Sequence, residues 1–199
     1  MVREPLLLVD GLALRRGGRE VCRGLQLRLD AGSSGLVLGA NGSGKSSLAL
    51  ALTGLLPTTD GSVERPERVG FVPQEPAFPA GARVGGYLAE LAALGGAGHG
   101  ARQQAEEAMR AFGLLDQGRR PVGELSRGWR QRLNLARGWL GRPPLVVLDE
   151  PQTALDPEGM ERLQDLIEQE DASFLVLAPP GTGCERLAPL LLELAGGAG

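Results

Sequence analysis

The sequence predicts an α/β fold with a parallel core sheet, an antiparallel β subdomain and an inserted α-helical subdomain. Two short strand-like segments, 35–38 and 145–148, are each followed directly by glycine or by carboxylates, as strands are when a ligand binds at their carboxyl ends. The alternating run 25–29 has the period of a strand that is buried on one face. Between 84 and 140 the apolar residues recur at helical spacing.

The elements follow from these patterns and from the residues that interrupt them. The helix after the first core strand ends near Gly54 and Pro57. The glycine-rich segment 95–100 predicts a flexible break inside the helical subdomain. In chain order we expect antiparallel strands within 6–30, a strand at 35–38, a helix at 46–55, a return to the sheet over 63–72, helices at 84–94, 102–112 and 127–140, and strands at 145–148, 174–177 and 190–194.

The composition fits one compact domain. The chain has 199 residues, 42% of them apolar, so we expect a single domain over 1–199, with its core in 1–77 and 141–199 and its helical insert in approximately 78–140. A net charge of −3, with no interleaved ladder of aromatic residues along the arginine cluster, argues against nucleic acid as a partner. No segment approaches the roughly 18 apolar residues of a membrane span, and no signal peptide is visible. We therefore expect a cytoplasmic protein.

The cysteines and the single histidine show no metal-site pattern. Cys22 and Cys184 lack CxxC spacing and a histidine partner, so we expect both to be reduced core thiols. His99 lies in the glycine-rich break and is expected to be a solvated loop residue.

The segment 39–46 matches the pattern G-x-x-x-x-G-K-[ST] at every fixed position, and it lies between a strand and a helix. Its glycines let backbone N–H groups point inward at phosphate oxygens, and the helix N-terminus adds positive charge at the same place. Lys45 is expected to reach the β- and γ-phosphates, and the Ser46 hydroxyl to bind magnesium. The expected phosphate-binding residues are Gly39, Asn41, Gly42, Ser43, Gly44, Lys45, Ser46 and Ser47.

Lys45 is also the only lysine among 21 basic residues. A compact ammonium on a flexible stem is retained where a planar guanidinium does not fit. Its position in this loop argues for retention by function rather than by chance.

A pair of carboxylates follows the second core strand. Asp149 and Glu150 come directly after the apolar segment 145–148, at the edge of the sheet where ligands of such folds bind. Asp149 is expected to hold magnesium, directly or through water, and Glu150 to polarise the water that attacks the γ-phosphate.

Four further segments occur in a fixed order: 72–76, 125–132, 149–151 and 153–156. Together with the phosphate loop they resemble the Q-loop, signature motif, second nucleotide motif and D-loop of the ABC ATPases, and the resemblance covers nearly the whole chain. It implies an ABC ATPase-like fold with ATP and Mg²⁺ as ligands. It also implies that Gln74 senses the magnesium and the attacking water.

The signature-like segment implies a composite site. In the family its serine and second glycine contact the γ-phosphate bound by another protomer, and these positions are Ser126 and Gly128 here. A simple helix N-cap is compatible with this role, because an exposed cap is also an anion site. The implied partners are a second ATPase protomer and integral membrane transporter subunits, which would hold the chain at the inner face of the cell membrane. The connection from Lys45 to Gln74 is short for the family, so we expect its usual small strand pair to be trimmed.

The chain departs from the family pattern at three places. The family has a switch histidine after the strand at 174–177, but Pro179 lies near that place. Arg16 stands where an aromatic ring usually stacks on adenine; its guanidinium either stacks on the base or is solvated. Arg127 and Trp129 replace the usual glycine and glutamine of the signature, which is a mild departure.

These observations leave several functional hypotheses. The leading one is an ABC transporter subunit that hydrolyses ATP at a composite dimer site, with Lys45, Gln74 and Glu150 catalytic and with Ser46, Gln74 and Asp149 at the metal. The alternative is a degenerate nucleotide-binding partner in a heterodimeric transporter, which Pro179 favours and Glu150 opposes. A soluble ATPase acting on DNA or ribosomes would need insertions or a second ATPase domain.

The cargo stays open at this stage. The chain stops in 196–199 with no regulatory domain expected after it, and this short form resembles the haem exporters of cytochrome c maturation. Drug, lipid and metal exporters are the other candidates.

Overall fold

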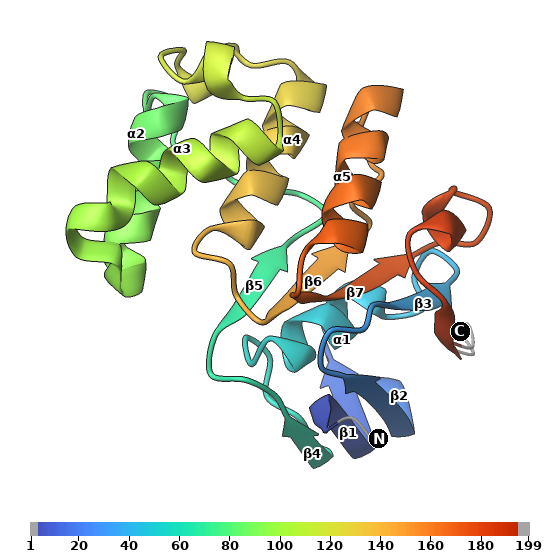
Figure 1. Cartoon of the computed structure of the whole chain (residues 1–199). Helices are drawn as coiled ribbons and strands as arrows, with labels where there is room; N and C mark the ends of the chain where they lie inside the picture. The colour runs from blue at the N-terminus through green and yellow to red at the C-terminus, as the bar shows by residue number, and fades with distance from the viewer. Residues whose placement is uncertain (1–3, 195–199) are drawn as a thin grey trace.

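The structure is a computed structural model, and it describes residues 4–194 (Figure 1). The predicted glycine-rich end at 196–199 lies outside the described residues. The described chain forms, in order, β1 (Pro5–Arg16), β2 (Arg19–Asp30), β3 (Gly35–Gly39), α1 (Lys45–Leu52), β4 (Asp60–Glu64), β5 (Val69–Val72), α2 (Val84–Ala92), α3 (Ala101–Ala111), α4 (Arg127–Trp139), β6 (Leu145–Asp149), α5 (Pro157–Gln169), β7 (Ser173–Ala178) and β8 (Leu190–Leu194).

Two sheets form the framework. The core sheet has the order β5-β6-β7-β3-β8, and its neighbouring strands pair in parallel. The second sheet, β2-β1-β4, is antiparallel and lies on the other side of α1 in Figure 1. Helices α2, α3 and α4 gather beyond the β5 end of the core sheet. The predicted α/β class, with its antiparallel subdomain and helical insert, is confirmed.

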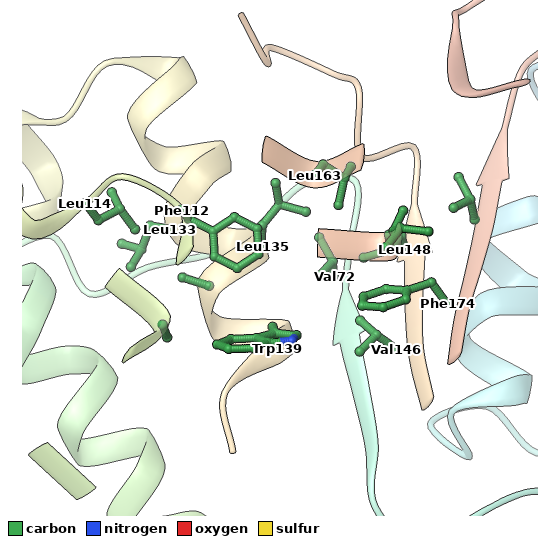
Figure 2. Packing of buried hydrophobic residues seen from close by; sticks show 14 of the residues in the cluster. Val72, Phe112, Leu114, Leu133, Leu135, Trp139, Val146, Leu148, Leu163 and Phe174 are labelled. Carbon is green, nitrogen blue, oxygen red and sulfur yellow. The ribbon is translucent and has the colours of Figure 1, made fainter. Parts of the chain in front are cut away.

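The three central strands of the core sheet, β6, β7 and β3, are buried on both faces, which explains why they are almost wholly apolar. Within β6, Val146 and Leu148 pack into a cluster with α4, α5 and the helical insert (Figure 2). Leu145 and Val147 point the other way, into a cluster with α1 and the antiparallel sheet. Two apolar layers therefore fix β6 from both sides, and the polar residues that follow it are held at a defined place.

The structure differs from the sequence prediction in two elements. Helix α5 was not predicted, although Asp156 caps it and Pro157 occupies its first turn, which is a strong start signal. The segment 63–72 does not return to one sheet as a unit. Val63 lies in β4 and pairs with β1, whereas β5 joins the core sheet, because Pro66 interrupts the run between them.

The helical insert contains the expected helices, with small differences at their ends. The glycine-rich break between α2 and α3 is a π-helical turn, Ala93–Ala97, followed by a 3-10 turn, Gly98–Gly100. His99 lies in the second turn and is exposed, as predicted. No helix among residues 4–194 is long and apolar enough to cross a bilayer.

Both cysteines are free thiols, as predicted, but only one of them belongs to the core. Cys184 is fully buried. Cys22 lies on β2 and is partly exposed, because β2 is an edge strand of the antiparallel sheet. The prediction that Cys22 is a core thiol is therefore wrong.

Candidate functional site

The loop after β3 has the backbone shape that phosphate binding requires. Gly42 and Gly44 have φ angles of 82° and 95°, a region that favours glycine, and Gly44 leads directly into α1. The Lys45 side chain is 4% exposed and curls back over the loop. Its ammonium donates to the carbonyls of Gly39 at 2.8 Å and Ala40 at 3.0 Å. The N-terminus of α1 and the lysine thus lie at one place.

The end of β6 brings the second set of predicted residues to the same edge. Glu150 has φ +48°, and its N–H donates to the carbonyl of Leu177 at 2.8 Å. This strained conformation directs its carboxylate to Lys45, with 3.2 Å between Nζ and Oε1. Gln74, just after β5, donates from Nε2 to Oε2 of Glu150 at 2.8 Å. Lys45, Gln74 and Glu150 are therefore in contact although they are far apart in the sequence.

Asp149 is a buried carboxylate with an unused oxygen. Its side chain is only 2% exposed, and Oδ1 has no hydrogen-bond partner. Burial raises the pKa of Asp149, the charge of Glu150 adds to that increase, and a hydrogen bond from Ser46 and the charge of Lys45 oppose it. A buried carboxylate oxygen without a partner costs stability, so a cation near Oδ1 would relieve that cost.

These residues fit Mg²⁺. No cluster of three or more His, Cys, Asp or Glu side chains able to hold a metal occurs within residues 4–194. Magnesium in nucleotide sites needs no such cluster, because it is held by one or two protein oxygens together with phosphates and water. Ser46 Oγ and the unpartnered Oδ1 of Asp149 are oxygen atoms that can serve as such magnesium ligands.

An open cleft of about 780 Å³ joins the phosphate loop, Gln74 and Glu150 to the tip of the β1–β2 hairpin, and Asp149 lies outside its lining. Sequence reasoning found Arg16 but missed Arg19, Glu20 and Val21, which line the same cleft. Gly17 and Gly18 mark a hairpin turn in the sequence, and this turn was the signal that could have placed the three residues at the cleft. The full lining is Arg16, Arg19, Glu20, Val21, Asn41, Gly42, Ser43, Gly44, Lys45, Ser46, Ser47, Gln74 and Glu150.

Ser126 and Gly128 lie at the start of α4 and are not part of this lining. Ser126 caps the helix, accepting from the N–H of Trp129 at 3.3 Å. Gly128 lies beside the carbonyl of Ala154, which a Cβ at Gly128 would approach to 3.3 Å. The signature-like and D-loop-like segments therefore meet each other, while neither of the two signature residues meets the phosphate loop of the same chain.

Helix α4 is tied to the two segments that carry catalytic candidates. Gln131 Nε2 donates to the carbonyl of Pro151 at 3.0 Å, just after Glu150. Asn134 Nδ2 donates to the carbonyl of Pro73 at 2.7 Å, just before Gln74. Helix α4 is thus hydrogen-bonded to the backbone of both segments.

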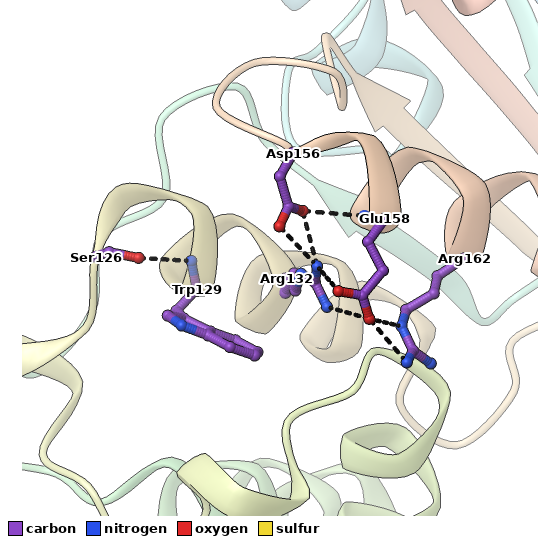
Figure 3. A network of polar contacts seen from close by, with 7 residues as sticks. Ser126, Trp129, Arg132, Asp156, Glu158 and Arg162 are labelled. Carbon is purple, nitrogen blue, oxygen red and sulfur yellow. Dashed lines mark hydrogen bonds and ion pairs between the residues drawn. The ribbon is translucent and has the colours of Figure 1, made fainter.

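A buried arginine links α4 to α5 (Figure 3). Arg132 is 3% exposed, stacks 4.9 Å from the Trp129 ring centre, and binds Asp156 through Nη2 at 2.8 Å. It also contacts Glu158 at 3.2 Å. Hydrogen bonding to Arg132 is the main cause that lowers the pKa of Asp156 and of Glu158. Both carboxylates stay ionised at neutral pH.

The segment after β7 contains no histidine. The carbonyl of Pro179 accepts a hydrogen bond from Thr182 Oγ1 at 2.8 Å. Farther on, Cys184 Sγ donates to Gln152 Oε1 at 3.2 Å, and burial raises the pKa of Cys184 to about 11. In the described chain, His99 is on the helical insert and does not line the cleft.

A sequence profile of the ABC transporter family matches residues 22–153, which is more than half of the chain. The chain belongs to the ABC transporter family. More specifically, it is a nucleotide-binding domain of that family, as the sequence resemblance implied.

Two groups of relatives illustrate the match. The chain is 36% identical over 167 residues to the zinc import ATP-binding protein ZnuC of Rhizobium meliloti, covering 83% of this chain and 54% of that protein. It is 37% identical over 171 residues to the cytochrome c biogenesis ATP-binding export protein CcmA of Cupriavidus necator, covering 80% of this chain and 75% of that protein. It thus spans little more than half the length of the first of these relatives.

Solved structures agree on the fold. The chain superposes with a TM-score of 0.81 and 26% identity on an inward-facing putative metal-chelate type ABC transporter, covering 94% of this chain and 79% of that chain. It also superposes, with a TM-score of 0.80 and 19% identity, on a dimeric ATP-binding cassette in a post-hydrolysis state with ADP and Pi, covering 94% of this chain and 96% of that chain. At 19% identity, this second structural similarity is evidence for the fold only.

Proposed function

We propose that the chain binds and hydrolyses ATP as the nucleotide-binding subunit of an ABC transporter. The contact of Lys45, Gln74 and Glu150 at the mouth of the phosphate loop carries this proposal. It puts a cation for the phosphates, a polar sensor and a carboxylate within one hydrogen-bonded group. The membership of the chain in the ABC transporter family supports it.

Each residue then has a separate task. The loop 39–46 and Lys45 bind the β- and γ-phosphates, and Ser46 with Asp149 binds Mg²⁺, which supplies charge neutralisation on the phosphate oxygens. Glu150 orients and deprotonates the attacking water, and Gln74 holds the Glu150 carboxylate in position. ATP breaks the Lys45–Glu150 ion pair when its phosphates take the ammonium, which releases the carboxylate for that role.

The hydrolytic site is completed by a second protomer. Ser126 and Gly128 are away from the phosphate loop of their own chain, which supports a role on the nucleotide of a partner. The Ser126 hydroxyl and the open N-terminus of α4 then face the γ-phosphate across a head-to-tail dimer. Closure on ATP and opening after hydrolysis move the membrane subunits, so the chain works at the cytoplasmic face of the membrane.

For the cargo we propose haem or another small exported molecule. The match to the CcmA relative, which extends over 75% of that protein, supports this choice, whereas the ZnuC match favours a metal. Purifying the chain with its membrane partner and measuring which molecule stimulates its ATPase activity separates these candidates. Stimulation by zinc and not by haem would overturn haem as the cargo and favour a metal.

A second candidate function is that of a nucleotide-binding partner with little hydrolysis of its own. The absence of a histidine after β7, where the described chain has Pro179 and Pro180, favours it. The retained contact between Lys45 and Glu150 opposes it.

One experiment tests the leading function and separates it from this alternative. Phosphate release by the purified chain is measured over a range of protein concentrations, with Glu150→Gln as the control. We expect a rate that rises faster than linearly with concentration and is lost in the variant, which should instead form an ATP-bound dimer on size exclusion. A flat, variant-like rate despite ATP binding would support the second candidate. A chain that stays monomeric in saturating ATP would contradict the composite site.

A further inference from the structure

Two arginines face each other at the tip of the β1–β2 hairpin. Arg16 and Arg19 are directly opposite in the register of the two strands, with Gly17 and Gly18 between them, and both line the cleft. Side chains at opposite positions start from Cβ atoms about 4.5–5.5 Å apart, so two like charges there repel each other. A hairpin with this pairing is less stable unless an anion lies between the charges.

No carboxylate neutralises this pair in the part of the chain that the structure describes. The ion pairs within residues 4–194 involve neither Arg16 nor Arg19. Glu20 is the nearest acid along the chain, but it pairs with Arg23 at 3.2 Å. Within the described chain, the cleft therefore has positive charge without an ion-pair partner at its hairpin side, whereas Lys45 is paired with Glu150.

The hairpin tip is held against the phosphate loop. Arg16 Nη1 donates to Ser47 Oγ at 3.3 Å, and Ser47 lies in the first turn of α1. Val21, on the same hairpin, packs on Gly44 so closely that a Cβ there would be 2.1 Å from its Cγ1. The Arg16 guanidinium is thus hydrogen-bonded to the first turn of α1, beside the helix N-terminus where phosphates bind.

The same cleft offers no flat ring for a base. None of the described residues that line it is aromatic. Stacking on aromatic rings is the usual way in which a protein holds a base. An arginine whose guanidinium is hydrogen-bonded to Ser47 is turned toward the phosphates, which leaves the base without a stacking partner from this hairpin.

We propose that Arg16 and Arg19 form a second phosphate clamp, so that the cleft binds the polyphosphate chain and accepts nucleoside triphosphates of any base. The proposal rests on the proposed nucleotide-binding function and names its ligand class more closely. Lys45 holds the β- and γ-phosphates, and the two arginines hold the phosphate next to the ribose. The anion between them also removes the repulsion within the hairpin.

The test compares four ligands on the whole chain by titration calorimetry in magnesium. The ligands are the non-hydrolysable imidotriphosphates of adenosine, guanosine and uridine, and inorganic tripolyphosphate. The variants are Arg16→Ala/Arg19→Ala, Arg16→Tyr and the matched control Arg15→Ala. Arg15 lies on the same hairpin, is exposed and does not line the cleft. Circular dichroism checks that each variant is folded.

We expect the wild type to bind the three nucleotides within about tenfold of one another. The double variant should bind all four ligands about tenfold or more weakly, with unchanged ratios between them, because two charged contacts to phosphate are lost. Arg15→Ala should match the wild type. Arg16→Tyr should weaken tripolyphosphate and favour adenosine over uridine, since a ring now offers stacking.

Two outcomes overturn the clamp and leave the nucleotide-binding function in place. One is a wild-type preference for adenosine over uridine above about a hundredfold. The other is tripolyphosphate affinity that the double variant leaves unchanged. A folded wild-type chain that binds none of the four ligands would instead overturn the proposed function itself.

Discussion

At the scale of single residues, the site concentrates features that cost stability. Glu150 adopts a positive φ that costs about 1–3 kcal/mol for a residue with a side chain. Asp149 keeps a buried oxygen without a partner, and Lys45 is almost fully buried beside Glu150. The strands around them, β3 and β7, are apolar and buried along nearly their whole length. Such unfavourable features, when they gather at one edge of a sheet, are typical of a ligand-binding site.

The first prediction concerns Asp149→Asn. The pKa of Asp149 is raised in the folded state, so its ionisation costs stability as pH rises through that folded pKa. The variant lacks this cost, and we expect its free energy of unfolding without ligand at neutral pH to increase by roughly 0.5–2 kcal/mol. It should also lose the stabilisation that Mg²⁺ adds to nucleotide binding.

Urea unfolding at neutral and acidic pH measures this effect, and the two proteins should converge in acid where Asp149 is protonated. Asp165→Asn, at an exposed position of α5, is the matched control and should change nothing. An Asp149→Asn variant that is less stable than the wild type at neutral pH would contradict the burial argument.

The second prediction concerns the two thiols. Burial raises the pKa of Cys184 to about 11 and also raises that of Cys22, but only Cys22 is partly exposed. Because the thiolate is the reactive form, a maleimide at neutral pH should modify Cys22 slowly and leave Cys184 unmodified until the chain unfolds. Mass spectrometry of the digested protein, with a urea-unfolded sample as reference, gives the answer. Faster labelling of Cys184 than of Cys22 would show that the C-terminal part of the fold opens.

At the scale of elements, α4 and α5 show how capping and ion pairing combine. Asp156 accepts from the N–H of Gly159 at 3.0 Å as the N-cap of α5, and it also binds the buried Arg132 of α4. One side chain thus starts one helix and joins it to another. Pro157 in the first turn and the buried positions Leu163 and Ile167, four residues apart, are sequence signals from which α5 could be predicted.

The third prediction separates the two roles of Asp156. Asparagine is also a good N-cap, so Asp156→Asn removes the ionic contact and keeps the cap. Asp156→Ala removes both, and we expect it to cost about 1 kcal/mol more than the asparagine variant. Thermal unfolding measures both variants. Equal losses for the two would mean that the cap contributes nothing.

The ionic part has its own pH signature. The pKa of Asp156 is lowered in the folded state, so its contribution is present above the unfolded pKa and is lost as pH falls through the folded pKa. The wild type should therefore lose stability in acid more steeply than Asp156→Asn. Asp156 is half exposed, so added salt should reduce this difference.

At the scale of the whole molecule, the sequence was sufficient to predict the strands that are packed on both faces. Strands β3 and β6 are buried on both faces, so their apolar runs identified them and placed Lys45 and Glu150 at one sheet edge. The tip of the β1–β2 hairpin is exposed, and no apolar pattern marks its register. Arg19, Glu20 and Val21 were missed at the cleft for that reason. Tertiary contacts such as Arg132 with Asp156 leave no periodic signal at all.

The fourth prediction belongs to the assembled dimer. Lys45→Ala disables the phosphate loop, and Ser126→Gly removes the signature hydroxyl while keeping an acceptable N-cap. Each variant alone should be inactive. Mixing equal amounts should restore up to about a quarter of the wild-type rate, because half of the dimers are mixed and each has one complete site. A phosphate-release assay of the mixture measures this, and a mixture that stays inactive while dimers form would contradict the composite site.

Because Lys45 is the only lysine of the chain, its amine is a unique internal handle for acylating reagents. In the folded protein that amine is enclosed by the carbonyls of Gly39 and Ala40 and by the Glu150 carboxylate. An acylating reagent reaches it only when those contacts open. The yield of one modified peptide therefore serves as a footprint of the phosphate loop, readable in a crude mixture without any engineered label.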